Sequence, residues 1–156
     1  MAHRGIATLS SALAVCFLLL SHFDGQFFLV HFYESLIYIA IVLMLFYFED
    51  RWAYMIGMLA PTVWLGLNLA WGGFGGILAQ ASTALHPRSP FFAMGLLSMI
   101  ASLLSVVMIA SCAFRWEREF RGNGRGWSTL VISAGVVGAY YALIVLWIMH
   151  WPRLAA

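Results

Sequence analysis

The sequence contains no lysine and carries little charge of any kind. All eight basic residues are arginine, and charged residues make up 9% of the 156 positions, against about 25% in a typical soluble domain. Without a lysine amine the chain cannot form a retinal or pyridoxal Schiff base, and it cannot supply the lysine of a phosphate-binding P-loop. The formal charge of +2 is too small to indicate nucleic-acid binding.

Cysteines and catalytic motifs are also scarce. Cys16 and Cys112 lie in apolar runs without CxxC spacing, so we expect both to behave as small buried hydrophobic residues. The sequence has no HExxH or GxGxxG motif, and the segments between apolar runs are too short for a catalytic domain. These absences favour a protein that is not an enzyme.

Hydrophobic residues are abundant instead, at 63% of the chain. They form continuous runs near the ~20 residues that a helix needs to cross a bilayer. The runs do not alternate with period two, which favours helices over a β-barrel. We therefore predict an all-α, polytopic integral membrane protein whose single domain is a five-helix transmembrane bundle. The predicted helices cover residues 6–23, 27–48, 52–72, 91–114 and 128–150.

Residues between and within these runs predict where the helices end or bend. Residues 82–90 and 115–126 contain charge, proline or glycine and are expected to form loops. Pro61 should kink the third helix, and the glycines of 72–76 should fray or turn it. Asn68 is expected to bond across helices.

Arginine placement predicts the direction of insertion. Arg4, Arg51 and the four arginines within 115–125 fall on one side of the predicted bundle, whereas Arg88 and Arg153 fall on the other. Cytoplasmic loops are enriched in basic residues. We therefore predict a cytoplasmic N-terminus, an external C-terminus and a multi-pass location in a cell membrane, such as the bacterial inner membrane.

The second predicted helix carries polar side chains that lipid cannot satisfy. His31, Glu34, Ser35 and Tyr38 follow the spacing i, i+3, i+4, i+7, so they share one helix face. Ionisable residues inside a membrane are costly and indicate function by default. This face should point at other helices or at a water-filled cavity.

The predicted topology gathers more ionisable residues near the same outer surface. His22, Asp24, His86 and His150 join His31 and Glu34 there. Imidazole and carboxylate together suit a transition metal, and histidine ligates haem iron or the central metal of a chlorin. The candidate cofactor-binding residues are His31, Glu34, His22 and His150. A glutamate beside a histidine also suits proton relay, and neighbouring side chains or a partner subunit could instead satisfy both groups.

Three functions remain open on these observations. The first is a non-catalytic accessory or structural subunit of a multi-subunit membrane complex, in respiratory or photosynthetic electron transfer, with other membrane subunits as partners. The second is a membrane protein that binds haem, chlorophyll or a transition metal at a His/Glu site near the outer surface. The third is a small proton-coupled transporter that uses Glu34.

Overall fold

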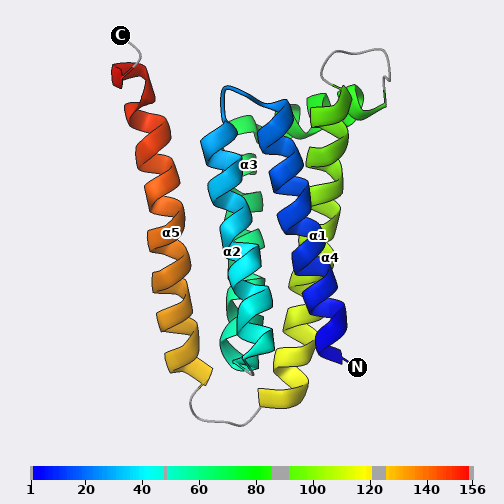
Figure 1. Cartoon of the computed structure of the whole chain (residues 1–156), viewed down its shortest axis with the longest axis vertical. Coiled ribbons are helices and arrows are strands. Elements are labelled where there is room, and N and C mark those ends of the chain that lie inside the picture. The colour runs from blue at the N-terminus through cyan, green and yellow to red at the C-terminus, as the bar shows by residue number, and fades with distance from the viewer. Residues whose placement is uncertain (1, 48, 86–91, 121–125, 155–156) are drawn as a thin grey trace.

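The computed structural model describes residues 2–47, 49–85, 92–120 and 126–154, and within these ranges every regular element is an α-helix. The helices run up and down in one bundle (Figure 1), so the two termini lie at opposite ends. We call the two ends the N-terminal end and the C-terminal end of the bundle. The elements are α1 (Ala2–Phe23), α2 (Phe28–Phe46), α3 (Asp50–Ala84), α4 (Phe92–Phe120) and α5 (Gly126–Leu154).

Each of the five helices contains a segment long and apolar enough to cross a membrane. These segments are Arg4–Phe23, Phe28–Phe46, Asp50–Gly72, Phe92–Phe120 and Gly126–His150. The prediction of an all-helical chain with five helices long and apolar enough to span a membrane is confirmed within the described residues, whereas insertion into a membrane stays a prediction. The direction of insertion stays a prediction.

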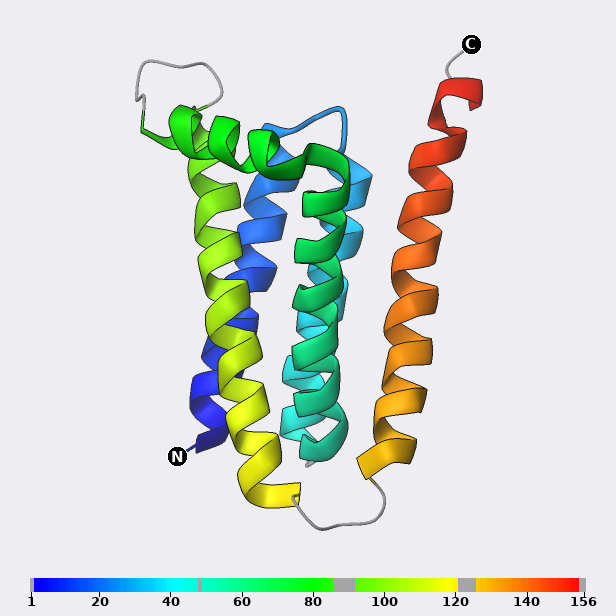
Figure 2. The ribbon, with the colours of Figure 1, turned by 180° about the vertical axis from the view of Figure 1, so that it is seen from behind.

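Helix α3 is longer than the sequence predicts. It was expected to finish at residue 72 and to be followed by a loop from residue 82, but it continues to Ala84. Around the glycine-rich stretch 72–76 the helix changes direction and then runs across the C-terminal end of the bundle toward α4 (Figure 2). Glycine tolerates such a bend. Pro61 lies inside α3 and is buried.

Helices α4 and α1 also extend beyond their predicted ends. The charged residues from Arg115 onward were expected to form a loop, but α4 includes them up to Phe120. Arg115 and Glu119 are one turn apart, and their side chains lie 3.5 Å from each other, which supports a helix. Helix α1 begins at Ala2 instead of residue 6. Charged residues therefore mark where these helices leave the apolar region, not where they end.

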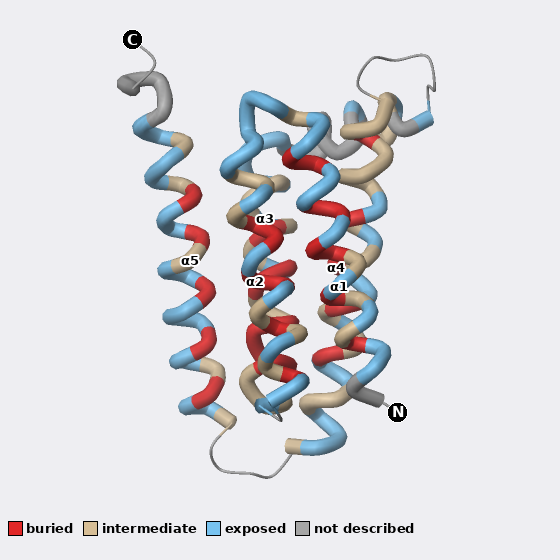
Figure 3. The backbone as a smooth tube through the Cα atoms, viewed as in Figure 1, coloured by how far each residue is buried: buried red, intermediate tan, exposed pale blue. Residues whose placement is uncertain are grey.

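The core lies where α1, α2, α3 and α4 face one another, and the buried face of α5 joins it through Val137, Tyr141 and Ile144 (Figure 3). The Phe17 ring stacks on Tyr38 with centroids 5.4 Å apart and meets Trp64 edge-on at 5.2 Å. The hydroxyl of Ser10 donates a hydrogen bond of 2.8 Å to the Tyr38 carbonyl and joins α1 to α2. These contacts hold three helices together in the middle of the bundle.

Helices α3 and α4 approach closely near the N-terminal end. A Cβ atom added to Gly57 would lie 2.8 Å from the Cys112 sulfur and 3.1 Å from the terminal carbon of Met108. Small residues allow membrane helices to pack at this distance. Cys16 and Cys112 are both buried free thiols, as the sequence predicts.

Helix α5 is attached through one face only. Near the N-terminal end the Arg51 guanidinium of α3 donates a hydrogen bond to the Thr129 hydroxyl. Nearer the C-terminal end the Tyr140 hydroxyl donates to the backbone carbonyl of Tyr33 in α2, and the two rings stack with centroids 4.2 Å apart. The buried residues of α5 form a stripe facing the other helices (Figure 3).

Candidate functional site

The start of α2 and the loop before it position three ionisable side chains. His31 and Glu34 are three residues apart on one face of α2. Asp24 comes from the preceding loop, where its carboxylate accepts a 3.3 Å hydrogen bond from the Phe27 backbone N–H. This local bond directs the Asp24 side chain back toward the first turn of α2.

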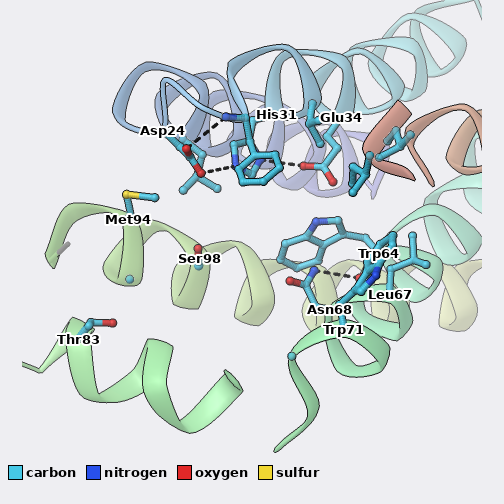
Figure 4. A pocket seen from close by; sticks show the side chains of 17 residues that line it. Asp24, His31, Glu34, Trp64, Leu67, Asn68, Trp71, Thr83, Met94 and Ser98 are labelled. Atoms are coloured by element: carbon cyan, nitrogen blue, oxygen red, sulfur yellow. Dashed lines mark hydrogen bonds and ion pairs between the residues drawn. The ribbon is translucent and has the colours of Figure 1, made fainter. Parts of the chain in front are cut away.

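The imidazole of His31 lies between two carboxylates. Its Nε2 atom is 3.4 Å from Asp24 Oδ2, and its Nδ1 atom is 3.1 Å from Glu34 Oε2 (Figure 4). A protonated imidazole donates from both nitrogens, so it satisfies both acceptors at once. We call this arrangement the Asp24–His31–Glu34 bridge.

Glu34 is the most buried member of the bridge. The side chains of Asp24 and His31 are 16% and 21% exposed, whereas that of Glu34 is 9% exposed. A buried carboxylate is costly unless charge and hydrogen bonds compensate it. His31 supplies this compensation from α2, and the side chain of Trp64 interacts with the same carboxylate from α3.

The bridge lines a cavity of about 560 Å³ at the C-terminal end of the bundle. Trp64, Asn68 and Trp71 of α3 face the bridge, and Met94 and Ser98 come from α4 (Figure 4). The remaining lining residues are mostly apolar, and they are Leu20, Phe27, Val30, Leu67, Gly72, Thr83, Gly95, Ile144 and Ile148. All five helices contribute to the cavity.

A second polar group lies beside Glu34 in the middle of the bundle. It consists of the buried side chains of Tyr38 from α2, Ser105 from α4 and Tyr141 from α5. Among the described residues, none of these three hydroxyl oxygens has a hydrogen-bond partner. Glu34 and Tyr38 are one helical turn apart, so polar groups continue from the cavity toward the bundle centre.

The structure brings together only part of the predicted histidine group. His31 and Glu34 meet as bridge partners, and Asp24 joins them. His22 is exposed and its ring packs against Phe23, and His150 is exposed with its Nδ1 atom 2.8 Å from the Leu146 carbonyl. Neither residue lines the cavity. His86 lies outside the described residues.

Other site residues differ from expectation or were missed. The Asn68 amide was expected to bond across helices, but among the described residues it donates to the Trp64 carbonyl of its own helix at 3.0 Å. The sequence pattern did not indicate Tyr141 or Met94 as site residues. Ser133 and Tyr141 lie two turns apart on one buried face of α5. This spacing is the signal that would have indicated Tyr141.

The donor set does not favour direct metal binding in this arrangement. Both nitrogens of His31 face carboxylates, so neither lone pair points at an open coordination position. Among the described residues, no group of three or more His, Cys, Asp or Glu side chains is placed to hold a metal ion. Binding of haem, chlorophyll or a transition metal stays a prediction.

Comparison with known proteins identifies no relative of this chain. No family model, no curated protein and no solved structure matches the chain.

Proposed function

We propose that this chain is a small proton-coupled transporter of the membrane, and that the Asp24–His31–Glu34 bridge is its proton-binding site. The observation that carries the proposal is a single imidazole held 3.4 Å and 3.1 Å from two carboxylates on the wall of a cavity. Chains of carboxylate and imidazole groups inside membranes are typical of proton relays. A structural ion pair would not need a cavity beside it.

The polar group below the bridge supports a route for protons toward the other side. Hydroxyl groups both donate and accept hydrogen bonds. Those of Tyr38, Ser105 and Tyr141 lie in the middle of the bundle next to Glu34. Glu34 therefore stands between a partly exposed pair of groups on one side and buried hydroxyls on the other.

Potential-driven proton uptake into proteoliposomes tests this function. Wild-type protein should acidify the vesicle interior, reported by an internal pH-sensitive dye, faster than protein-free vesicles do. Glu34→Gln removes the titratable group but keeps the side-chain volume, so uptake should fall at least tenfold. Glu117→Gln, the same change at an exposed carboxylate of α4, is the matched control and should keep wild-type uptake.

Two outcomes would overturn the proposal. Wild-type uptake no faster than that of empty vesicles would remove proton transport from this chain. Unchanged uptake in Glu34→Gln would remove the bridge from the route.

The accessory subunit predicted from the sequence is the second candidate. The attachment of α5 favours it, because its outer face carries large exposed apolar residues such as Val136, Leu143 and Met149. In such a complex, a helix of a neighbouring subunit would pack on this face in place of lipid. Purification in mild detergent tests it, since co-purifying membrane proteins are expected and recovery of the chain alone would contradict it.

A further inference from the structure

An apolar groove lies between α2 and α5 on the outside of the bundle, next to the cavity. Its volume is about 380 Å³, and its walls are Leu29, Val30, Phe32, Tyr33, Leu36, Leu143, Ile144 and Trp147. Phe32 and Leu36 of α2 and Leu143 of α5 are 40% to 59% exposed. In a membrane these side chains face the acyl chains, so the groove is open to lipid.

The groove and the cavity share part of their walls. Val30 of α2 and Ile144 of α5 line both spaces. A smaller hollow of about 210 Å³ borders both, sharing Phe27 with the cavity and Leu29 with the groove. The apolar groove therefore adjoins the polar cavity across only two side chains, and neither is polar.

The charge of the cavity selects the head group of a ligand. Two carboxylates face one imidazole, so when both carboxylates are ionised one negative charge stays uncompensated even with His31 protonated. None of the described cavity-lining residues is arginine, and the sequence has no lysine. Among the described lining residues, an anionic head group would find no positive charge except that of His31, which both carboxylates already engage.

Aromatic side chains favour the same sign of charge. Trp64, Trp71 and Phe27 line the cavity around the bridge. Indole and phenyl faces attract cations, and quaternary ammonium groups in particular are bound by such aromatic walls. The cavity thus combines excess negative charge with aromatic faces.

We propose that the bridge cavity binds the cationic head group of a lipophilic amine whose hydrocarbon chain occupies the α2–α5 groove, with Val30 and Ile144 forming the passage between them. The inference rests on the proposed function, because it names the substrate class of that transporter. The ligand enters sideways from the bilayer, and its positive head group replaces the bridge proton as the partner of Glu34.

Equilibrium binding to protein in lipid nanodiscs tests the ligand class on wild-type protein first. Decyltrimethylammonium, titrated below its micellar concentration and corrected for empty nanodiscs, should bind saturably. Tetramethylammonium, which has the head group without the chain, should bind at least tenfold more weakly. Decyl sulfate, which has the same chain length and a negative head group, should show no saturable binding.

Two substitutions then test the passage and the charge. Val30→Trp fills the shared wall, and Glu34→Gln removes the negative charge, so each should weaken decyltrimethylammonium binding at least tenfold. Leu103→Trp, the matched control, adds the same indole at an exposed position of α4 that lines neither space and should bind like wild type. Ile144→Trp repeats the passage test from the opposite wall if the first variant does not give a monodisperse protein.

The outcomes separate this inference from the proposed function. Equal saturable binding of decyl sulfate, or unchanged binding in both passage variants, would overturn the lipophilic-amine site even if proton uptake through Glu34 is present. Saturable, Glu34-dependent binding of decyltrimethylammonium without any proton uptake would support the site and overturn proton coupling.

Discussion

Helices α3 and α4 pack tightly in one half of the bundle and enclose a cavity in the other. Near the N-terminal end, the position of a Gly57 Cβ would be 2.8 Å from the Cys112 sulfur. Toward the C-terminal end, Asn68 of α3 and Ser98 of α4 line a space of about 560 Å³. The dense half supplies packing stability, and this allows the other half to stay open for a ligand.

The charges of the two halves differ as well. Arg4, Arg51, Arg115 and Arg118 lie toward the N-terminal end, together with Glu49, Asp50, Glu117 and Glu119, whereas Asp24 and Glu34 lie with the cavity at the C-terminal end. Basic residues are retained on the cytoplasmic side during insertion. The dense half should therefore face the cytoplasm and the cavity should face outward.

Cysteine labelling in intact cells tests which half of the bundle faces outward. Its expected effect is the largest, because each introduced thiol either reacts with the external reagent or does not. Gly25→Cys places a thiol in the α1–α2 loop, where no atom lies within 4 Å of the new Cβ. It should react with a membrane-impermeant maleimide added outside. Glu117→Cys, at an exposed position near the N-terminal end, should react only after permeabilisation. Wild-type protein is the blank, since both native thiols are buried, and the reverse labelling pattern would place the cavity on the cytoplasmic side.

Gly57→Leu should produce the next largest effect, because its side chain would collide with Cys112 and Met108 of α4. Overpacking a tight core costs roughly 1–3 kcal/mol. The expected result is a matching loss in the free energy of unfolding, measured by denaturant titration in mild detergent. Gly66→Leu is the matched control on the same helix, since no atom lies within 4 Å of its Cβ position, and it should unfold like wild type.

A companion substitution sharpens the contrast between the halves. Ser98→Leu adds a side chain to the cavity wall, where there is space for it, so its cost should be clearly smaller than that of Gly57→Leu. It should still weaken ligand binding. Equal destabilisation by Ser98→Leu and Gly57→Leu would mean that the two halves are packed alike.

The sequence predicts the helices well because apolar runs report directly on the solvent that surrounds them. It predicts their ends less well, since α3 bends within the glycines of 72–76 and α4 continues past Arg115. A glycine cluster signals freedom to bend, but the neighbouring helices decide whether the chain bends or stops.

Some residues of the candidate site could likewise be predicted from the sequence, and others could not. Helical spacing alone places His31 and Glu34 on one face, because that relation is local. The inclusion of Asp24 depends on the backbone bond from Phe27, and that of Trp64 and Tyr141 depends on how α3 and α5 pack. The exclusion of His22 and His150 from the cavity depends on helix rotation, which the order of residues does not reveal.

Tyr140→Phe should have the smallest effect, and it tests how α5 is held along the open half. The substitution removes the hydrogen bond from the Tyr140 hydroxyl to the Tyr33 carbonyl but keeps the ring stack at 4.2 Å. Interhelical hydrogen bonds in membrane proteins contribute roughly 0.6 kcal/mol on average, so a loss of about that size is expected in the same unfolding titration. Tyr47→Phe, at a residue 77% exposed, is the matched control and should show no loss. A loss as large as that of Gly57→Leu would contradict the comparison, because a single bond to α5 would then matter as much as the dense contact between α3 and α4.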